Sequence, residues 1–378
     1  MTPQQRARAL AGQLVGGGHL TPEWLPAFVG VRRDLFLPDR VWLRDDTGPY
    51  RALDRATDPD GWWQAAYSDR PVVTQVEDGA DAETSNEPSS SASMPRVVAR
   101  MPHQLAVEPG MTVLEIGTGT GYNAALLAHR LGGGHVTSVD IDPAVLEGAR
   151  RAFNGARRAP HLAIADGAQG YPDRAPYDRI IATCAVHSIP RPWITQTRPG
   201  GIIVTPLGTA MVNGVMLKLT VRNDGTAVGR IVDDAAFMWL RSQRIPRSTP
   251  APRPEPAVDS STKTDPRALG DSDALLAVGL QVPGCRYTVG HGPDGEFTLW
   301  FSDGTSWASV DYEPGAEVYA VQQYGPRTLW DEIEKALDWW TAAGEPERTR
   351  LGIVVDDRRQ WAFLDSPDRP LPGGSWSG

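Results

Sequence analysis

Hydrophobic positions change their spacing along the chain, and the middle third alternates between two patterns. Short apolar runs predict buried strands at Val113–Ile116, Val136–Val139, Ile180–Ala182 and Ile202–Val204. Between the first two runs, residues 122–131 place apolar side chains at helical spacing, and Asp142-Pro143 is typical of the start of another helix. This rhythm over residues 111–222 predicts a doubly wound α/β fold with a parallel sheet, whose ligands bind beyond the carboxyl ends of the strands.

The pattern differs on both sides of this region. The first forty residues are predicted to be helical, with a helix start at Thr21-Pro22-Glu23, and residues 43–62 are polar and rich in turn formers. Beyond residue 268 we predict two hairpins separated by a helix over residues 329–342. The paired runs are Glu296–Phe301 with Thr305–Val310, and Gly352–Val355 with Gln360–Leu364. We therefore expect an N-terminal helical segment and a smaller C-terminal α+β domain.

Two segments have the composition of linkers. Residues 246–268 contain six prolines and several serines and threonines, which predicts an extended linker. Residues 77–93 are acidic and rich in serine. That composition suits a linker, and it equally suits a loop that wraps over a ligand.

Composition narrows the class of protein. The chain has 378 residues, of which 40% are apolar, so it can bury a sizeable core. No apolar run approaches the roughly 20 residues that span a bilayer, and the N-terminus has no apolar signal core, so we expect a cytoplasmic protein without a membrane partner. The net charge of −9 argues against nucleic acid as the main partner. Two cysteines and seven scattered histidines predict neither a disulfide framework nor a metal site.

The sharpest motif follows the first predicted strand and reads Glu115-Ile-Gly-Thr-Gly-Thr-Gly-Tyr122. Its glycines have the order Gly-x-Gly-x-Gly, whereas a dinucleotide fingerprint has its third glycine one place later. Glu115 would repel a pyrophosphate and would suit a cationic ligand. S-adenosylmethionine (SAM) is such a ligand, because it carries an amino group and a sulfonium and has no phosphate. A glycine-rich turn on its own is also compatible with a tight loop.

Two acidic residues further along the chain agree with SAM. Asp140 ends the second strand about twenty residues after the glycines, where a carboxylate accepts both ribose hydroxyls. Asp166 follows the third strand region and is placed to accept from the adenine amine. We therefore predict a Rossmann-like SAM-dependent methyltransferase sheet. The predicted SAM-binding residues are Glu115, Gly117, Thr118, Gly119, Gly121, Tyr122, Asp140, Ile141, Asp166 and Gly167.

Beyond the SAM loop, the chain resembles the protein-L-isoaspartate O-methyltransferase family. The motifs that carry the resemblance are the N-terminal signature Val31–Pro38, the segment Ala66–Pro71, Ser93-Met94-Pro95, the SAM motif Val113–Ala128 and the late strand motif Gln196–Gly208. They follow one another in the order that the family has. The resemblance implies that SAM is the cofactor and that a carboxylate is the methyl acceptor.

The chain departs from the repair enzymes of that family in two respects. The segment before Ser93 is longer and more acidic, and Met94-Pro95-Arg96 replaces their usual Ala or Gln, Pro, His. Residues 266–378 are expected to have no counterpart in them. The long form resembles actinobacterial relatives that tailor ribosomally made peptides (lanthipeptides, lasso peptides, graspetides). That resemblance implies methylation of an Asp side chain, followed by closure to aspartimide and sometimes by opening to isoaspartate.

The chemistry of the acceptor indicates which residues to seek. A carboxylate is already an anion at neutral pH, so methyl transfer to it needs no general base. Hydroxyl groups hold such an anion without the damping of nucleophilicity that an Arg or Lys would cause. We predict that Ser93 orients the acceptor, with Thr183 and Ser91 as further candidates, and the alternative for the two serines is a solvated loop. Cys184 is expected to be a buried apolar residue, whereas His187 either packs or touches the substrate.

Tryptophans are concentrated at the C-terminal end, where seven of the 13 lie beyond residue 299. Those on the predicted helix 329–342 are expected to pack in a core. Trp300 and Trp307 belong to a predicted hairpin, where they either pack or line a peptide groove. An exposed strand edge there is a further place for an extended peptide.

Three hypotheses for the function remain at this point. The first is a peptide-tailoring carboxyl methyltransferase, which the length beyond the catalytic part favours. The second is a general repair enzyme for isoaspartate in damaged proteins. The third, a binding or scaffold protein with a vestigial SAM fold, is disfavoured because the glycines and acids are all retained. We expect a peptide or protein partner that bears Asp or isoaspartate, and the sequence leaves the oligomeric state open.

The sequence also predicts how the chain is divided. The predicted parts are an N-terminal helical segment and substrate cap (1–76), a SAM-dependent methyltransferase domain (77–245), a Pro-rich linker (246–268) and a C-terminal α+β accessory domain for peptide recognition (269–378).

Overall fold

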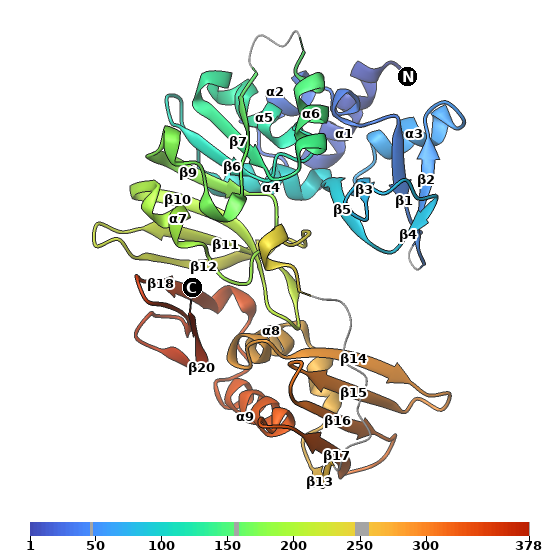
Figure 1. Ribbon diagram of the computed structural model, residues 1–378, viewed down its shortest axis with the longest axis vertical. Coiled ribbons are helices and arrows are strands. Elements are labelled where there is room, and N and C mark those ends of the chain that lie inside the picture. The colour runs from blue at the N-terminus through green and yellow to red at the C-terminus, as the bar shows by residue number, and fades with distance from the viewer. Residues whose placement is uncertain (46–47, 155–158, 246–256, 378) are drawn as a thin grey trace.

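The computed structural model describes residues 1–45, 48–154, 159–245 and 257–377. These residues form a central sheet of ten strands and two sheets of five strands. Figure 1 shows the five-stranded sheet of the C-terminal part at one end of the molecule, while the N-terminal sheet lies beside the central one. In the described ranges, no helix is both long enough and apolar enough to cross a membrane.

The central sheet has the strand order β20-β19-β18-β12-β11-β10-β9-β6-β7-β8. Strands β10, β9, β6, β7 and β8 run parallel, and the other strands join antiparallel. The bounds are β6 (Val113–Ile116), β7 (Val136–Asp140), β8 (His161–Ile164), β9 (Tyr177–Ala182), β10 (Thr197–Gly208), β11 (Asn213–Val221), β12 (Ala227–Asp234), β18 (Leu351–Val355), β19 (Arg359–Leu364) and β20 (Pro370–Ser377). The predicted doubly wound α/β sheet is confirmed, with an antiparallel extension.

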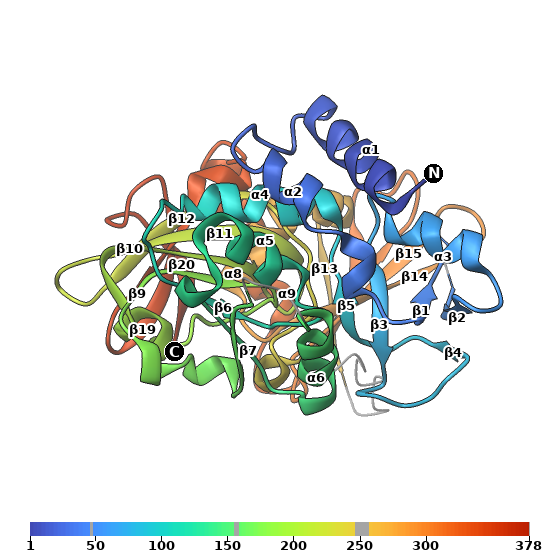
Figure 2. The same ribbon diagram turned by 90° about the horizontal axis from the view of Figure 1, so that it is seen from above.

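Both faces of the parallel strands are covered, which explains their uninterrupted apolar runs. On β9, Ile181 belongs to the core shared with α1, α2, α4 and α5, whereas its neighbour Ile180 belongs to the core that contains α7 and α8. Figure 2 shows α1, α2 and α4 along one side of the sheet. The bounds are α1 (Pro3–Gly16), α2 (Leu25–Gly30), α4 (Pro95–Leu105), α5 (Tyr122–Leu131), α6 (Pro143–Ala152), α7 (Arg191–Thr195) and α8 (Ser272–Gln281).

Two predicted helix starts have different outcomes. Asp142 caps α6, because its carboxylate accepts from the backbone N–H groups of Ala144 and Val145. The start predicted at Thr21 is instead a turn, and α2 begins at Leu25.

The N-terminal part is only partly helical. A 3₁₀ turn at Arg33–Phe36 follows α2, and an antiparallel sheet then has the order β4-β2-β1-β3-β5, with α3 (Pro59–Ala66) beside it. The strands are β1 (Arg40–Leu43), β2 (Tyr50–Asp54), β3 (Val72–Val76), β4 (Thr84–Ser85) and β5 (Pro88–Ala92). Strands this short leave no extended alternation for a sequence pattern to detect. Because β4 and β5 belong to this sheet, the segment 77–93 is not a free linker.

The C-terminal sheet has the order β13-β17-β16-β15-β14, and α9 (Leu329–Ala342) packs against it. Its strands are β13 (Val258–Thr262), β14 (Arg286–His291), β15 (Phe297–Ser302), β16 (Trp307–Tyr312) and β17 (Tyr319–Tyr324). The predicted hairpins and the helix over 329–342 are confirmed. Trp330 and Trp340 are buried in the core, as predicted for this helix.

The last three strands leave the C-terminal sheet and return to the central one. β18 pairs with β12, where Val355 lies opposite Ala227. The segment predicted as one accessory domain, 269–378, is therefore divided between two sheets, because local patterns do not reveal a pairing between strands so far apart in sequence. Residues 246–256 of the predicted linker lie outside the described residues, and residues 258–262 form β13.

Candidate active site

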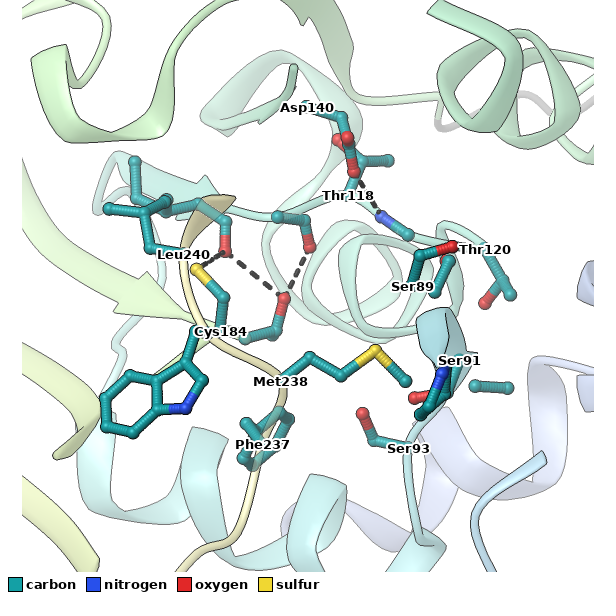
Figure 3. A pocket seen from close by; sticks show the side chains of 18 of the residues that line it. Ser89, Ser91, Ser93, Thr118, Thr120, Asp140, Cys184, Phe237, Met238 and Leu240 are labelled. Atoms are coloured by element: carbon teal, nitrogen blue, oxygen red, sulfur yellow. Dashed lines mark hydrogen bonds between the residues drawn. The ribbon is translucent and has the colours of Figure 1, made fainter. Parts of the chain in front are cut away.

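A cavity of about 560 Å³ lies beyond the carboxyl ends of β6, β7 and β9. The glycine-rich loop and the residues that follow β7 and β9 form one wall. Two other segments face them: residues 89–93, called the serine segment below, and residues 235–245, called the strap. Figure 3 shows Asp140 on one side of the cavity and Ser91 and Ser93 on the other. This is the edge of the sheet at which the parallel topology places a ligand.

The glycine-rich loop brings its backbone to the cavity and is tied to the next strand. Gly117 has φ +89° and Gly119 has φ +53°, a region that favours glycine. The N–H groups of Gly117 and Thr118 donate to the carbonyl oxygen of Val139 at 2.9 and 3.0 Å. The N–H of Gly119 donates to Asp140 Oδ2 at 2.9 Å. The loop therefore has a fixed shape with room for a ligand close to its backbone.

Asp140 and Asp166 both line the cavity. The Asp140 carboxylate accepts from two backbone N–H groups, those of Gly119 and Asp142, and burial nevertheless raises its pKa. Asp166 accepts from the N–H of Ala168 at 2.9 Å through Oδ1. Because a carboxylate has about four acceptor sites, both side chains keep capacity for hydroxyl or amine donors of a ligand. Ile141 lies between them in the chain and is 40% exposed, an apolar surface that a planar ring can cover.

Glu115 does not line the cavity, and here the prediction of direct ligand contact is corrected. Its side chain is fully buried behind the loop, where Oε1 accepts from Asn123 Nδ2 at 2.7 Å and Oε2 accepts from the Ser138 hydroxyl. Burial raises the pKa of this carboxyl to about 7. Glu115 therefore connects β6, β7 and α5 beneath the loop, and its effect on a ligand is electrostatic.

Three other predicted residues also shape the site. Gly121 does not line the cavity but begins α5, where a Cβ would lie 3.0 Å from Phe153 Cε2. Tyr122 is a buried cavity-lining residue whose ring packs against Phe28 and Phe36. A Cβ on Gly167 would lie 2.5 Å from Ile116 Cγ2, so a side chain there would displace the end of β6.

The serine segment presents unengaged hydroxyls to the cavity. Ser91 and Ser93 both line it and are half-buried. Among the described residues, none forms a hydrogen bond with either hydroxyl. Ser89, in contrast, donates to Gln75 Oε1 at 2.8 Å. The two open hydroxyls are the groups that can meet an acceptor carboxylate.

Thr183 lines the cavity but its hydroxyl is already engaged. Its Oγ1 donates to the carbonyl oxygen of Gly117. A threonine hydroxyl has one hydrogen, so it cannot also donate to a substrate carboxylate in this arrangement. The expected role as a carboxylate holder is corrected to that of a support for the glycine-rich loop.

The strap closes the cavity and was not predicted from the sequence. Phe237–Leu240 contribute apolar side chains, and the strap is held by backbone bonds between Ala185 and the residues Met238 and Leu240. The run of four apolar residues at 237–240 was the available signal, but it has no period that assigns it a partner.

Ion pairs fix the strap to the acidic segment across the cavity. Arg244 binds Asp78 through two hydrogen bonds of 2.6 and 2.7 Å. Arg241 lies 3.4 Å from Asp78 and 3.2 Å from Asp142. Both arginines that line the cavity from the strap are thus paired with acids. We call Asp78 and the two arginines that pair with it, Arg241 and Arg244, the latch.

Cys184 lines the cavity, whereas His187 lies outside it. Burial raises the pKa of the Cys184 thiol, which lines the cavity in its neutral form. Burial of the ring lowers the pKa of His187, which lies near Trp239 and lines a second cavity, so packing and substrate contact both stay open for it. Within the described ranges, no cluster of His, Cys, Asp or Glu is suited to a metal ion.

The residues present fit SAM. The fixed loop, the two acceptor carboxylates and the exposed Ile141 match an amino acid, a ribose and an adenine. The buried Glu115 and Asp140 favour a positively charged ligand over a phosphate.

Comparison with known proteins agrees with this fit. The family model for protein-L-isoaspartate(D-aspartate) O-methyltransferase matches residues 52–244, just over half of the chain. The protein-L-isoaspartate O-methyltransferase of Hyperthermus butylicus is 32% identical over 248 residues, which cover 63% of this chain and 89% of that protein. The enzyme of that name from Pyrococcus horikoshii is 38% identical over 149 residues, which cover 39% of this chain and 67% of that protein.

A solved structure named protein-L-isoaspartate O-methyltransferase shares the fold. It is 23% identical, has a TM-score of 0.52 and covers 92% of this chain and 96% of that chain. The expectation that residues 266–378 have no counterpart in proteins of that name is therefore wrong at the level of fold. Taken with the family model, these relatives establish that the chain is a SAM-dependent methyltransferase of the protein-L-isoaspartate(D-aspartate) O-methyltransferase family.

Proposed function

We propose that the protein transfers a methyl group from SAM to the free carboxylate of an isoaspartyl residue in a peptide or protein. The observation that carries the proposal is the open Ser93 hydroxyl, which faces the acid-rich part of the same cavity. Family membership supports the acceptor, since the relatives that match the chain are named for L-isoaspartate.

The groups around Ser93 suit a carboxylate nucleophile. Ser93 donates a neutral hydrogen bond, which orients a carboxylate oxygen and leaves its other lone pairs available. Arg241 and Arg244 are held by acids, so neither is a free cation that would neutralise the acceptor. The reference pKa of such a carboxyl is about 4, so the acceptor is ionised at neutral pH and needs no general base. When bound, SAM supplies an electrophilic methyl group on a positively charged sulfur.

Besides an oriented carboxylate, methyl transfer requires that water be excluded, and apolar residues of the strap supply this. Phe237, Met238 and Leu240 cover the cavity opposite the glycine-rich loop. Alignment of two reactants in a dry site can contribute roughly 7–11 kcal/mol to lowering the barrier. In the ester product, the next backbone nitrogen attacks the ester carbonyl, methanol leaves and a five-membered imide forms without further help from the enzyme.

The predicted SAM-binding residues are proposed to divide into three groups. Gly117, Thr118, Gly119, Tyr122 and Gly167 shape the cavity, while Asp140, Ile141 and Asp166 contact the nucleoside. Glu115 and Gly121 act from behind the loop.

A second candidate function is tailoring of an Asp residue in a ribosomally made peptide, with the ester closing to aspartimide. It is favoured by the longer acidic segment before Ser93, which forms β4 and β5 and whose last residues, 88–93, line the cavity. The C-terminal part no longer distinguishes the two functions, because a solved structure named protein-L-isoaspartate O-methyltransferase covers 92% of the chain. For this reason we place the isoaspartyl acceptor first.

The C-terminal part is proposed to bind the peptide on one side of the acceptor. A second cavity of about 470 Å³ shares Arg244 and Ile245 with the first, and its other walls include Leu280, Arg286 and Trp376. A peptide whose reactive residue lies near Ser93 would have neighbouring residues within reach of this cavity. On this proposal, the methyltransferase part (77–245) and the accessory part (269–378) act on one substrate, with residues 1–76 capping it.

Mass spectrometry of two matched peptides tests the acceptor. The peptides differ only in whether one residue is isoaspartyl or aspartyl, and each is incubated with the protein and SAM. We expect the isoaspartyl peptide to gain the mass of one methylene group and then to lose methanol. Modification of the aspartyl peptide alone would favour the tailoring function.

A further inference from the structure

Arg33 is a buried arginine beside the serine segment that the proposed chemistry does not yet use. Its side chain is 1% exposed, and it belongs to the N-terminal signature of the sequence. The guanidinium group donates to six backbone carbonyl oxygens. These belong to Ala65, Ala66, Ser68, Arg70, Ala92 and Ser93.

The six carbonyl oxygens that Arg33 binds belong to two separate parts of the fold. Ala65–Arg70 end α3 and form the turn after it, whereas Ala92 and Ser93 end the serine segment. The bonds from Nη2 to the carbonyl oxygens of Ala92 and Ser93 are both 3.1 Å long. Arg33 does not line the cavity itself, so it reaches the site only through these carbonyls. The position of the Ser93 backbone therefore depends on Arg33.

The charge of Arg33 has no acidic partner at contact distance. Within the described chain, no carboxylate lies at ion-pair distance from its guanidinium, because the adjacent Arg32 takes Asp34. Asp69 acts on it only through space, and Nε has no hydrogen-bond partner among the described residues. Burial lowers the pKa of Arg33 to about 10, so the side chain remains a cation at neutral pH. A buried cation whose hydrogen bonds all go to carbonyl oxygens leaves a positive potential around it, and the one carboxylate that acts on it through space, Asp69, is itself paired with Arg96.

We propose that Arg33 is the positioning residue of the acceptor site: it fixes the Ser93 backbone and supplies the positive potential that attracts the substrate carboxylate without touching it. The inference rests on the proposed function. A cation in direct contact would hold the carboxylate but reduce its nucleophilicity. A cation one peptide group behind Ser93 still favours an anion, and it also polarises the peptide groups whose carbonyls it binds. The strap arginines do not provide this potential, because Asp78 and Asp142 pair with them.

The test separates attraction of charge from support of structure. We would compare binding of an isoaspartyl peptide with binding of the same peptide in which that carboxylate is a carboxamide, using calorimetry. The wild-type protein is expected to prefer the carboxylate by at least about tenfold. R33M is expected to bring the ratio of the Kd of the carboxamide peptide to the Kd of the carboxylate peptide close to one. It should also lower kcat/KM for the isoaspartyl peptide, while the Kd for SAM stays within about twofold. R33K is expected to keep most of the ratio, because it keeps the charge, and to lower kcat, because it cannot bind six carbonyls.

Hydrogen exchange adds a readout of position, with faster exchange expected at residues 91–94 in both variants. The proposal is overturned if R33M weakens both peptides equally, or if R33K loses the preference. The R33K measurement tests the proposal even if R33M does not fold. Absence of methyl transfer by the wild-type protein to the isoaspartyl peptide would overturn the proposed function and this inference together. If the wild-type protein methylates the isoaspartyl peptide but R33M keeps the wild-type preference for carboxylate over carboxamide, only the inference about Arg33 is overturned.

Discussion

The backbone N–H of Gly119 donates to Asp140 Oδ2 at 2.9 Å, and this bond joins the glycine-rich loop to the end of the neighbouring strand. The other oxygen of the same carboxylate accepts from the N–H of Asp142 at 3.0 Å. The two carboxylate oxygens of Asp140 therefore both hold the loop in shape and face the cavity.

Replacement of Asp140 by Asn is expected to weaken SAM binding. D140N retains one acceptor oxygen but replaces the other with an amide donor, which opposes the N–H of Gly119 or of Asp142. Loss of a bond to a charged acceptor corresponds to about a 10–100-fold increase in the Kd for SAM. Isothermal titration calorimetry measures this, with D173N at an exposed site as the matched control. An unchanged Kd in D140N would exclude Asp140 from the nucleoside site.

Replacement of Ser93 by Ala is expected to slow methyl transfer while leaving SAM binding intact. The Ser93 hydroxyl lacks a partner among the described residues, so its loss breaks no internal bond and should leave stability nearly unchanged. A hydrogen bond to a charged group accounts for about a 10–100-fold fall in kcat/KM. Transfer of tritiated methyl to an isoaspartyl peptide provides the measurement, and S261A on β13 is the control. Equal rates for S93A and S261A would remove Ser93 from the proposed role.

Glu115 should make stability depend on pH in a recognisable direction. Its folded pKa of about 7 lies above the unfolded value of 4.5, so the folded state binds the proton more tightly. Its contribution is present below pH 4.5 and is lost as the pH rises towards 7. E115Q has no such proton to lose. Its stability relative to wild type is therefore expected to increase between pH 4.5 and 7, by on the order of 3 kcal/mol at most.

Chemical denaturation at several pH values tests this expectation for Glu115. The exposed Glu317 gives the matched control E317Q, which should show no such trend. A constant difference between E115Q and wild type across this range would contradict the raised pKa.

The latch should control how fast SAM leaves. Arg244 and Arg241 join the strap to Asp78, whose side chain is about half exposed, so D78N should change stability by less than about 1 kcal/mol. D78N is instead expected to increase the dissociation rate of SAM severalfold, because the strap is released from the opposite wall. Stopped-flow fluorescence measures this rate. High salt should reproduce the effect in wild type and add little to D78N. Salt-independent dissociation in both proteins would contradict a role for the latch.

The sequence is most informative where structure is local. The run Val113–Ile116, the glycines after it and the helix to Leu131 follow one another directly, so their pattern predicts both the fold and the cofactor. Ser93 was selected through the resemblance of Ser93-Met94-Pro95, at the start of α4, to a motif of the family, and its role stays a prediction.

Non-local pairings account for what the sequence does not reveal. The contact of β18 with β12 joins residues more than a hundred positions apart, and so does the bond between Arg244 and Asp78. The position of Glu115 behind the loop depends on Asn123 and Ser138, which come from a helix and a different strand. The position of Glu115 next to the glycine-rich motif in the sequence did not reveal on which side of the loop its carboxylate lies.

We propose that the open Ser93 hydroxyl and the acid-rich SAM site together direct methylation of an isoaspartyl carboxylate. The most direct measurement is kcat/KM for transfer of tritiated methyl from SAM to an isoaspartyl peptide and to its aspartyl twin, each at saturating SAM. We expect clear incorporation into the isoaspartyl peptide, lost on treatment with base, and little into the aspartyl twin. Equal or greater incorporation into the aspartyl peptide, or none into either, would contradict it.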